Sequence, residues 1–236
     1  MQPTRHATRL IPRCLLCLLP TALCLLSSGC NIIGAAAQVL PQPDVAPAYT
    51  KLSNQTVGVM VWVDRAIAID YPSLQADVAK SVVNKLQETS EPKKKSDAHK
   101  ELTNVRYLDP LAVIKWQADH PELNGFPSTE LATRLGVTRV IYVELIVFET
   151  RSEVSVDLFK GTVMAKLDVL EVATNPDGTK KAKVAYSDGD LRSIYPKKAP
   201  EGTAGTDVNS DMIYNKTVDA FTTDVVLKFV QHPADM

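Results

Sequence analysis

A group of charged and polar side chains comes directly after the first valine-rich stretch of the chain, Gln55–Val63. Asp64 and Arg65 follow at once, and Asp70 and Tyr71 lie a short distance further on. Open α/β sheets tend to bind ligands at the carboxyl ends of their strands, and a charge pair there can hold a small polar ligand. The simpler alternative is a loop in which Asp64 and Arg65 satisfy backbone groups or each other.

Glu144 stands alone as an acid within the apolar stretch Thr138–Thr150. Burying a carboxylate is costly unless it is paired, and such groups often mark functional sites. The possible ligand pocket therefore consists of four residues, Asp64, Arg65, Tyr71 and Glu144. The alternatives for Glu144 are that it lies on a solvated part of the sheet or pairs with a nearby lysine or arginine.

The other polar residues form no known catalytic or metal-binding pattern. His99, His120 and His232 have no metal-ligand spacing with one another, and Asp188 with Asp190 falls short of the ligand set of a calcium loop. The sequence also lacks a nucleophile elbow, a phosphate-binding glycine loop and a zinc-protease motif. We therefore expect a protein that is not an enzyme and that uses no cofactor and no metal.

The first thirty residues contain every cysteine of the chain, namely Cys14, Cys17, Cys24 and Cys30. Three arginines and no acid come first, an uncharged apolar run over 14–26 follows, and small residues lead to Cys30. This layout is typical of a secretory signal. The apolar run is short for a membrane span, which needs about 20 residues, and Pro20 interrupts it.

The C-terminal end of this segment, Leu26-Ser27-Ser28-Gly29-Cys30, resembles the lipobox of bacterial lipoproteins. The resemblance implies that residues 1–29 are a signal peptide and that the thiol of Cys30 carries a diacylglycerol, which anchors the protein in the bilayer. It departs from the family at Ser27, where leucine is favoured. Asn31 would, by the enteric sorting pattern, permit transfer to the periplasmic face of the outer membrane. The alternative is an uncleaved anchor that continues through Asn31–Leu40.

Composition narrows the possible partners. Cleavage before Cys30 would remove three of 26 basic residues and leave 27 acidic ones, which gives a net charge of about −4. A nucleic-acid binder would show a strong basic excess, so we expect no nucleic acid partner. A single remaining cysteine cannot form an internal disulfide, so the apolar core must hold the fold.

The chain then divides into a tether and one domain. Residues 30–50 contain three prolines and little charge, which is typical of an extended tether, and residues 51–233 are expected to form a single domain. Valine-rich or alternating stretches predict strands at 55–63, 103–109, 138–150, 161–172 and 181–188, with a loop over 189–207. Helices are expected at 71–90, 111–120, 126–136 and 209–231.

This order predicts an α/β (α+β) domain with a mixed sheet of about five strands, packing helices and a long C-terminal helix. The almost continuous apolar run of Thr138–Thr150 indicates a central strand that is covered on both sides.

The stretch ELATRLGVTRVIYVEL, with Leu135 and Gly136 before the strand and Glu144 inside it, carries a family resemblance. Together with the strand–turn–strand unit that follows, it resembles the periplasmic domain of curli-secretion-channel lipoproteins and the amino-terminal domain of the TolB translocation protein. The resemblance implies an envelope domain that works by binding or assembling. Pore formation is not implied, because Glu149–Gly161 is too short for a membrane-spanning hairpin.

The sequence thus predicts a membrane-anchored lipoprotein that acts as a non-enzymatic binding or assembly component of the cell envelope. Its partner would be another envelope protein or further copies of the chain itself. The alternative is a small-ligand receptor or enzyme that uses the pocket near Asp64 and Arg65.

Overall fold

The computed structural model describes residues 43–91, 99–153, 155, 158–199, 201–204 and 209–234. The predicted signal peptide, Cys30 and the tether as far as residue 42 lie outside these residues. The chain divides into two compact units, of which Asp44–His232 is one. The other comprises Met1–Pro43 and Pro233–Met236, and of it only Pro43, Pro233 and Ala234 are described.

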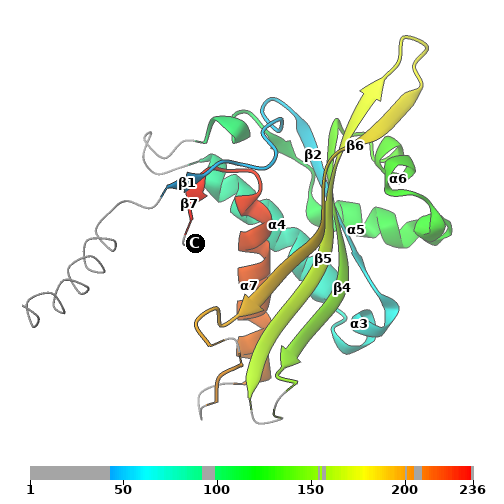
Figure 1. Cartoon of the computed structure of the whole chain (residues 1–236). Helices are drawn as coiled ribbons and strands as arrows, with labels where there is room; N and C mark the ends of the chain where they lie inside the picture. The colour runs from blue at the N-terminus through cyan, green and yellow to red at the C-terminus, as the bar shows by residue number, and fades with distance from the viewer. Residues whose placement is uncertain are drawn as a thin grey trace, which may run out of the picture. The chain divides into compact units, whose positions relative to one another are not determined.

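The unit Asp44–His232 is built on a five-stranded mixed sheet in the order β3-β2-β4-β5-β6 (Figure 1). β2 pairs in parallel with β3 and β4, whereas β5 pairs antiparallel with β4 and β6. The strands are β2 Thr56–Val63, β3 Arg106–Tyr107, β4 Arg139–Arg151, β5 Phe159–Thr174 and β6 Lys180–Tyr195. Two short strands, β1 Asp44–Val45 and β7 His232–Pro233, pair separately. The predicted α/β (α+β) class with about five strands is confirmed.

Helices pack on both faces of the sheet (Figure 1). One face, here called the inner face, is covered by α4 Leu74–Ser90 and the C-terminal helix α7 Ser210–Leu227. The other, the outer face, meets α5 Pro110–Asp119 and α6 Ser128–Arg134. A short helix, α3 Arg65–Asp70, follows β2, and two 3₁₀ turns are η2 Lys100–Leu102 and η3 Pro121–Gly125.

Side-chain caps mark the starts of α5 and α7. Asp109 accepts a hydrogen bond from Leu111 N at 3.0 Å in front of Pro110, and Asn209 accepts one from Met212 N at 2.8 Å. Each side chain satisfies one of the amide groups that a helix leaves unpaired at its first turn. The long C-terminal helix is therefore confirmed, and it begins where the sequence predicted.

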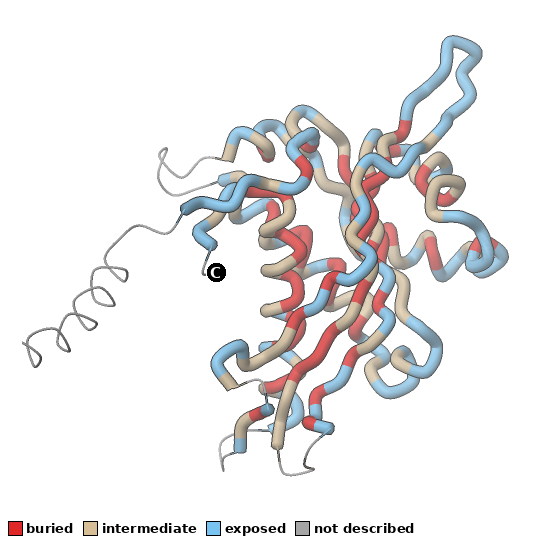
Figure 2. Tube along the Cα trace, in the orientation of Figure 1, coloured by how far each residue is buried: buried red, intermediate tan, exposed pale blue. Residues whose placement is uncertain are grey.

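The two faces are buried to very different extents (Figure 2). Within the described residues, the inner core joins 27 buried residues, mostly from the sheet, α4 and α7, among them Leu74, Val82, Phe221 and, just beyond α7, Phe229. The outer core has nine buried residues, so the outer helices cover only part of their face. This asymmetry leaves a portion of the sheet open to solvent.

A β-bulge in β4 changes which residues face inward. Leu145 pairs with Ala165 but Val147 pairs with Met164, so Ile146 is the extra residue. Beyond the bulge Phe148 turns into the inner core, and Ile146 is 53% exposed. Strict alternation would put Val147 on the same face as Leu145 and Phe148 on the other, but the one inserted residue reverses the two faces beyond Leu145.

Several boundaries differ from the sequence-based expectation. The strand predicted over 103–109 is only Arg106–Tyr107, and the helix predicted over 209–231 ends at Leu227. The predicted loop over 189–207 begins with strand, because β6 pairs with β5 as far as Tyr195. At the other end, Asp44–Thr50 belong to the same compact unit as the sheet. Tyr49 is buried there against Phe229 with ring centroids 6.4 Å apart, so hydrophobic contact holds these residues on the domain.

Candidate functional site

A cleft of about 300 Å³ opens on the outer face, at the carboxyl end of β2 and beside the middle of β4. Its wall contains aromatic, apolar and acidic side chains. The lining residues are Trp62, Val63, Asp64, Asn124, Tyr142, Glu144, Leu145 and Ile146. This hollow is called the β2/β4 cleft below.

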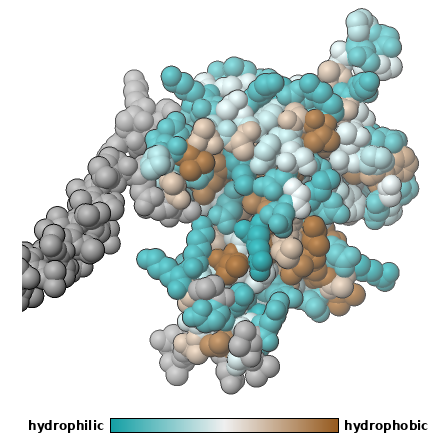
Figure 3. Space-filling model, viewed as in Figure 1, coloured by the Kyte–Doolittle hydropathy of each residue, from teal (hydrophilic) through white to brown (hydrophobic). Residues whose placement is uncertain are grey.

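The cleft exists because the outer core stops halfway along β4. Val140 is buried in that core and Tyr142 packs at its margin, whereas Glu144 and Ile146 are exposed. The prediction that this strand is covered on both sides is therefore correct for its first half only. Figure 3 shows apolar side chains lying among hydrophilic ones on the face of the molecule that is turned to the viewer.

Asp64 lines the cleft but also has a structural task. Its carboxylate accepts a hydrogen bond from Ala66 N at 2.8 Å and thereby caps α3. The segment after β2 was predicted as a loop and is a short helix. Asp64 accepts from the backbone N–H of Ala66, as the simpler alternative for this residue proposed. Arg65 is exposed on α3 and is not among the residues that line the cleft.

Glu144 is exposed rather than buried. It lies directly opposite Lys166 on β5, and its charge contributes to the raised pKa of that lysine. The hydrogen bond from Lys166 to Asp168 is the larger cause of this rise. Glu144 therefore lies on a solvated part of the sheet, opposite a lysine, which is one of the alternatives considered for it.

The buried acid of the outer face is Asp168, which sequence reasoning did not single out. Its side chain is 2% exposed, accepts a hydrogen bond from Ser187 Oγ at 2.6 Å and pairs with Lys166 Nζ at 2.9 Å. Only the antiparallel partner β6, which was predicted to be its hairpin mate, places Ser187 over the carboxylate.

Tyr142 connects this polar group to the cleft. Burial raises the pKa of its phenol, and the nearby carboxylates of Glu144 and Asp168 raise it further. The phenol is therefore a neutral hydroxyl at physiological pH. Trp62, on the adjacent strand, has an indole Nε1 that is buried and has no acceptor within the described part of the chain.

Tyr71 lies away from the cleft. Its ring packs against Phe148 and Tyr214, with centroids 4.8 and 5.9 Å apart, and its hydroxyl is 3.1 Å from Thr150 Oγ1. These contacts belong to the inner core. Of the four predicted pocket residues, the structure therefore brings Asp64 and Glu144 together in one cleft and places Arg65 and Tyr71 elsewhere.

The segment Asp44–Thr50, which precedes the first strand of the sheet, is held by a charged cluster around Tyr49. Tyr49 Oη accepts a hydrogen bond from Arg139 Nε at 2.9 Å and donates one to Glu171 Oε1 at 3.1 Å. Burial raises the pKa of Tyr49 to about 12. Burial would also raise the pKa of Glu171, but hydrogen bonds from Lys183 and Tyr49 and the charge of Arg139 outweigh it and hold that pKa below its usual value.

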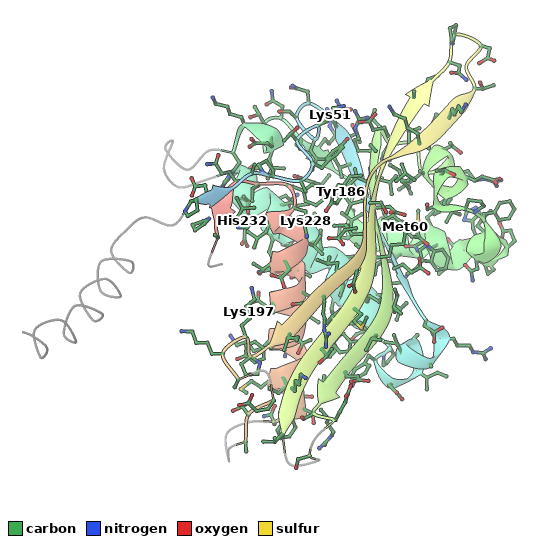
Figure 4. All side chains as sticks on the ribbon, in the orientation of Figure 1. Lys51, Met60, Tyr186, Lys197, Lys228 and His232 are labelled. Carbon is green, nitrogen blue, oxygen red and sulfur yellow. The ribbon has the colours of Figure 1, made fainter. Side chains whose placement is uncertain are left out.

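The end of α7 is fixed to β6 by a second charged group. Lys228 Nζ lies 2.9 Å from Asp188 Oδ2, and Tyr186 lies beside them (Figure 4). Burial alone would lower the pKa of Lys228, but the hydrogen bond to Asp188 raises it above its usual value. Asp188 is thus held in an ion pair with Lys228.

No three His, Cys, Asp or Glu side chains among the described residues lie close enough together to hold a metal ion. The same part of the chain contains no helix that is both long enough and apolar enough to cross a membrane.

Comparison with known proteins gives distant likenesses only. No family model matches the chain, and no curated protein matches it. A PelC dodecamer from Paraburkholderia phytofirmans has a TM-score of 0.34 at 10% identity, with 79% of this chain and 96% of that chain covered. The hypothetical protein CT253 from Chlamydia trachomatis has a TM-score of 0.40 at 16% identity, with 74% and 95% covered.

Lipoprotein GNA1162 from Neisseria meningitidis has a TM-score of 0.39 at 14% identity, with 72% of this chain and 97% of that chain covered. Likenesses this distant do not assign a function. The resemblance to curli-channel lipoproteins and TolB stays a prediction, because no family model matches the chain.

Proposed function

We propose that this protein is a lipid-anchored, non-enzymatic component of the bacterial cell envelope that binds a protein partner through the β2/β4 cleft. The observation that carries the binding role is the open half of the outer sheet face. An exposed apolar side chain, Ile146, two aromatic rings and two carboxylates meet there at one hollow. Aromatic and apolar walls with a few polar groups are typical of binding sites.

The anchor is proposed from the sequence. Basic residues, an apolar run and Gly29-Cys30 form the layout that lipoprotein signals have. Acylated Cys30 would hold the protein in the membrane, and more than one acyl chain is needed for stable anchoring. Asn31 favours the periplasmic face of the outer membrane as its location.

Binding fits the cleft better than catalysis does. Its polar lining consists of Asp64, Asn124, Tyr142 and Glu144. A nucleophile next to a general base is the usual mark of covalent catalysis, and the described residues that line the cleft include no histidine, serine, cysteine or lysine, so its two carboxylates have none of these groups as a partner there. Asp64 is further occupied as the cap of α3.

The second candidate is a receptor for a small cationic ligand. Two carboxylates beside the rings of Trp62 and Tyr142 would suit an ammonium or guanidinium group, which is attracted to both acids and aromatic faces. The cleft volume of about 300 Å³ is at the lower end for small-molecule sites.

A crosslinking experiment in intact cells of a native host tests the binding role. A photocrosslinking side chain replaces Ile146 in the cleft, and the matched control replaces Lys216, which is exposed on α7 of the inner layer. We expect the Ile146 probe to capture a defined protein band and the Lys216 probe not to. Equal capture from both positions, or none, would refute the binding role.

The same cells test the anchor. The N-terminal peptide from the membrane fraction should begin at Cys30 and carry the mass of a diacylglycerol, and Cys30→Ser should release the protein from the membrane. A membrane-bound peptide that retains residues before Cys30 and carries no lipid would refute the lipoprotein assignment. Thermal stabilisation by a polyamine without any protein crosslink would favour the receptor candidate.

A further inference from the structure

We infer that the occupant of the β2/β4 cleft is the β5–β6 hairpin arm of a second copy of this chain. The arm is defined as Val172–Ala182, the part of the hairpin beyond the rest of the sheet. This inference rests on the proposed binding role of the cleft and names its partner.

Only the base of the arm, Val172 and Ala182, packs against the outer core, and the rest of the arm has no structural neighbour among the described residues. β4 pairs with β5 only as far as Arg139 opposite Glu171, so beyond this point two strands continue alone. Residues 173–181 are all exposed, and the hairpin projects from the sheet in Figures 1 and 2. An isolated two-stranded hairpin is marginally stable in water. A projection of this kind gains stability when another surface covers it.

The turn of the arm is nevertheless well ordered by its own hydrogen bonds. Asn175 N donates to Thr179 O at 2.8 Å, and Asp177 Oδ1 accepts from Thr179 N at 2.9 Å and from Thr179 Oγ1 at 2.6 Å. Gly178 supplies the left-handed backbone that the turn needs, with φ of 84°. A rigid projection loses little conformational entropy when it docks, which favours binding.

The arm nevertheless carries a net positive charge. The hydrogen bond from Thr179 lowers the pKa of Asp177, so this carboxylate stays ionised, but Lys180 and Lys181 outnumber it. Lys180 and Lys181 follow directly and form no ion pair within the described part of the chain, whereas Lys183 pairs with Glu171. The arm thus presents two free ammonium groups on a fixed support.

The cleft has the complementary features. Asp64 and Glu144 form no ion pair within the residues that the structure describes, and they stand beside the rings of Trp62 and Tyr142. A lysine that enters such a hollow can place its ammonium near the acids and its methylene stem along the rings. Opposite charges on two patches favour the correct encounter and disfavour others.

Apolar surface is exposed close to both features. Val184, at the root of the arm, is 47% exposed, and Ile146, at the rim of the cleft, is 53% exposed. Exposed branched aliphatic side chains at both sites can shield each other from water when arm and cleft meet.

The arm cannot occupy the cleft of its own chain. β5 runs antiparallel to β4 and passes Arg139, the first residue of β4, before the arm begins, so the arm extends away from the cleft, which β4 first reaches at Tyr142. Lys180 pairs with Thr174, so about six residues of strand, roughly 20 Å at about 3.3 Å per residue, separate the level of this lysine from that of Tyr142. The contact is therefore intermolecular and joins two different patches, which generates a reciprocal pair, a ring or an extended chain of copies.

The test uses the full-length protein in host membranes, with isotope-labelled and unlabelled copies coexpressed. A photocrosslinking side chain at Ile146 should join a labelled cleft to an unlabelled arm peptide that contains Lys180 and Lys181. The arm reversal, defined as Lys180→Glu combined with Lys181→Glu, should reduce this mixed crosslink at least about tenfold, because like charges then face each other. Glu144→Lys should reduce it as well.

Combining the arm reversal with Glu144→Lys should restore the crosslink, since the charges are again opposite. The matched control reverses Lys51 and Lys216, which are exposed and make no ion pair among the described residues, and it should leave the crosslink unchanged. Restoration by the combined variant would support the inference in a way that simple misfolding cannot imitate.

The outcomes separate this inference from the proposed function. Capture of a different protein at Ile146, unaffected by arm reversal, would overturn the inference and leave the binding role intact. Absence of any capture would refute both. Loss of binding to vesicles containing anionic lipid on arm reversal, with no change in crosslinking, would assign the arm to a lipid surface instead and overturn the inference.

Discussion

A substitution at Gly161 tests how closely α7 packs on the sheet. Gly161 is buried in β5, and a Cβ atom built there would overlap the hydroxyl of Thr217 on α7. It would also lie 2.7 Å from Thr217 Cβ and 2.8 Å from Thr217 Cγ2. No rotation of the threonine side chain relieves the contact with its Cβ, so Gly161→Ala must push the helix and the strand apart.

The expected cost follows from this overlap. Overpacking a core costs about 1–3 kcal/mol, and we expect about 3 kcal/mol for Gly161→Ala because the strand and helix backbones must separate. Thr217→Ala in the same chain removes the hydroxyl and the methyl group but keeps Cβ. It should therefore recover about 1 kcal/mol of the loss, as a favourable coupling energy between two contacting positions.

Equilibrium urea unfolding, followed by the fluorescence of Trp62 and Trp116, measures these free energies of unfolding. The matched control is Gly189→Ala in β6, where an added Cβ meets no atom within 4 Å and little change is expected. If Gly161→Ala costs no more than the control, or if Thr217→Ala does not improve it, the close packing of α7 on β5 is wrong.

Three further perturbations have expected outcomes. Because the pKa of Glu171 is depressed in the fold, its stabilisation is present above the unfolded value of about 4.3 and is lost as the pH falls below it. Glu171→Gln should therefore flatten the fall in the free energy of unfolding between about pH 5 and 3, and an unchanged slope would contradict this. Asp168→Ala should cost about 1–3 kcal/mol by removing the acceptor of Ser187 and Lys166, and Asp168→Asn should cost less, as measured by urea unfolding. Gly178→Ala should weaken the turn by about 1 kcal/mol, seen as faster amide exchange in the arm, and Gly178→Asn should weaken it less because asparagine tolerates positive φ. Amide exchange as slow in both variants as in the unsubstituted chain would show that the turn does not require this backbone conformation.

Local patterns in the sequence were sufficient for the main elements and their order, although the short helix α3 was predicted as a loop. The caps Asp109 and Asn209, the four-residue spacing of Leu74, Val78, Val82 and Leu86 on α4 and the turn at 175–178 are all set by neighbours along the chain. The fold class follows from that order, because helices and strands with these apolar faces can bury them in few ways.

The site depended on contacts between distant segments. Glu144 was predicted as an unusual acid in an apolar strand, but its exposure depends on where α5 and η3 stop covering the outer face. Asp168 is buried because β6 places Ser187 over it, and the bulge at Ile146 reverses the faces of β4 through its pairing with β5. Which acid is buried and where a cleft opens are thus decided by tertiary packing. A local pattern establishes that a strand has two faces, but the helices that reach those faces determine which of them meets water.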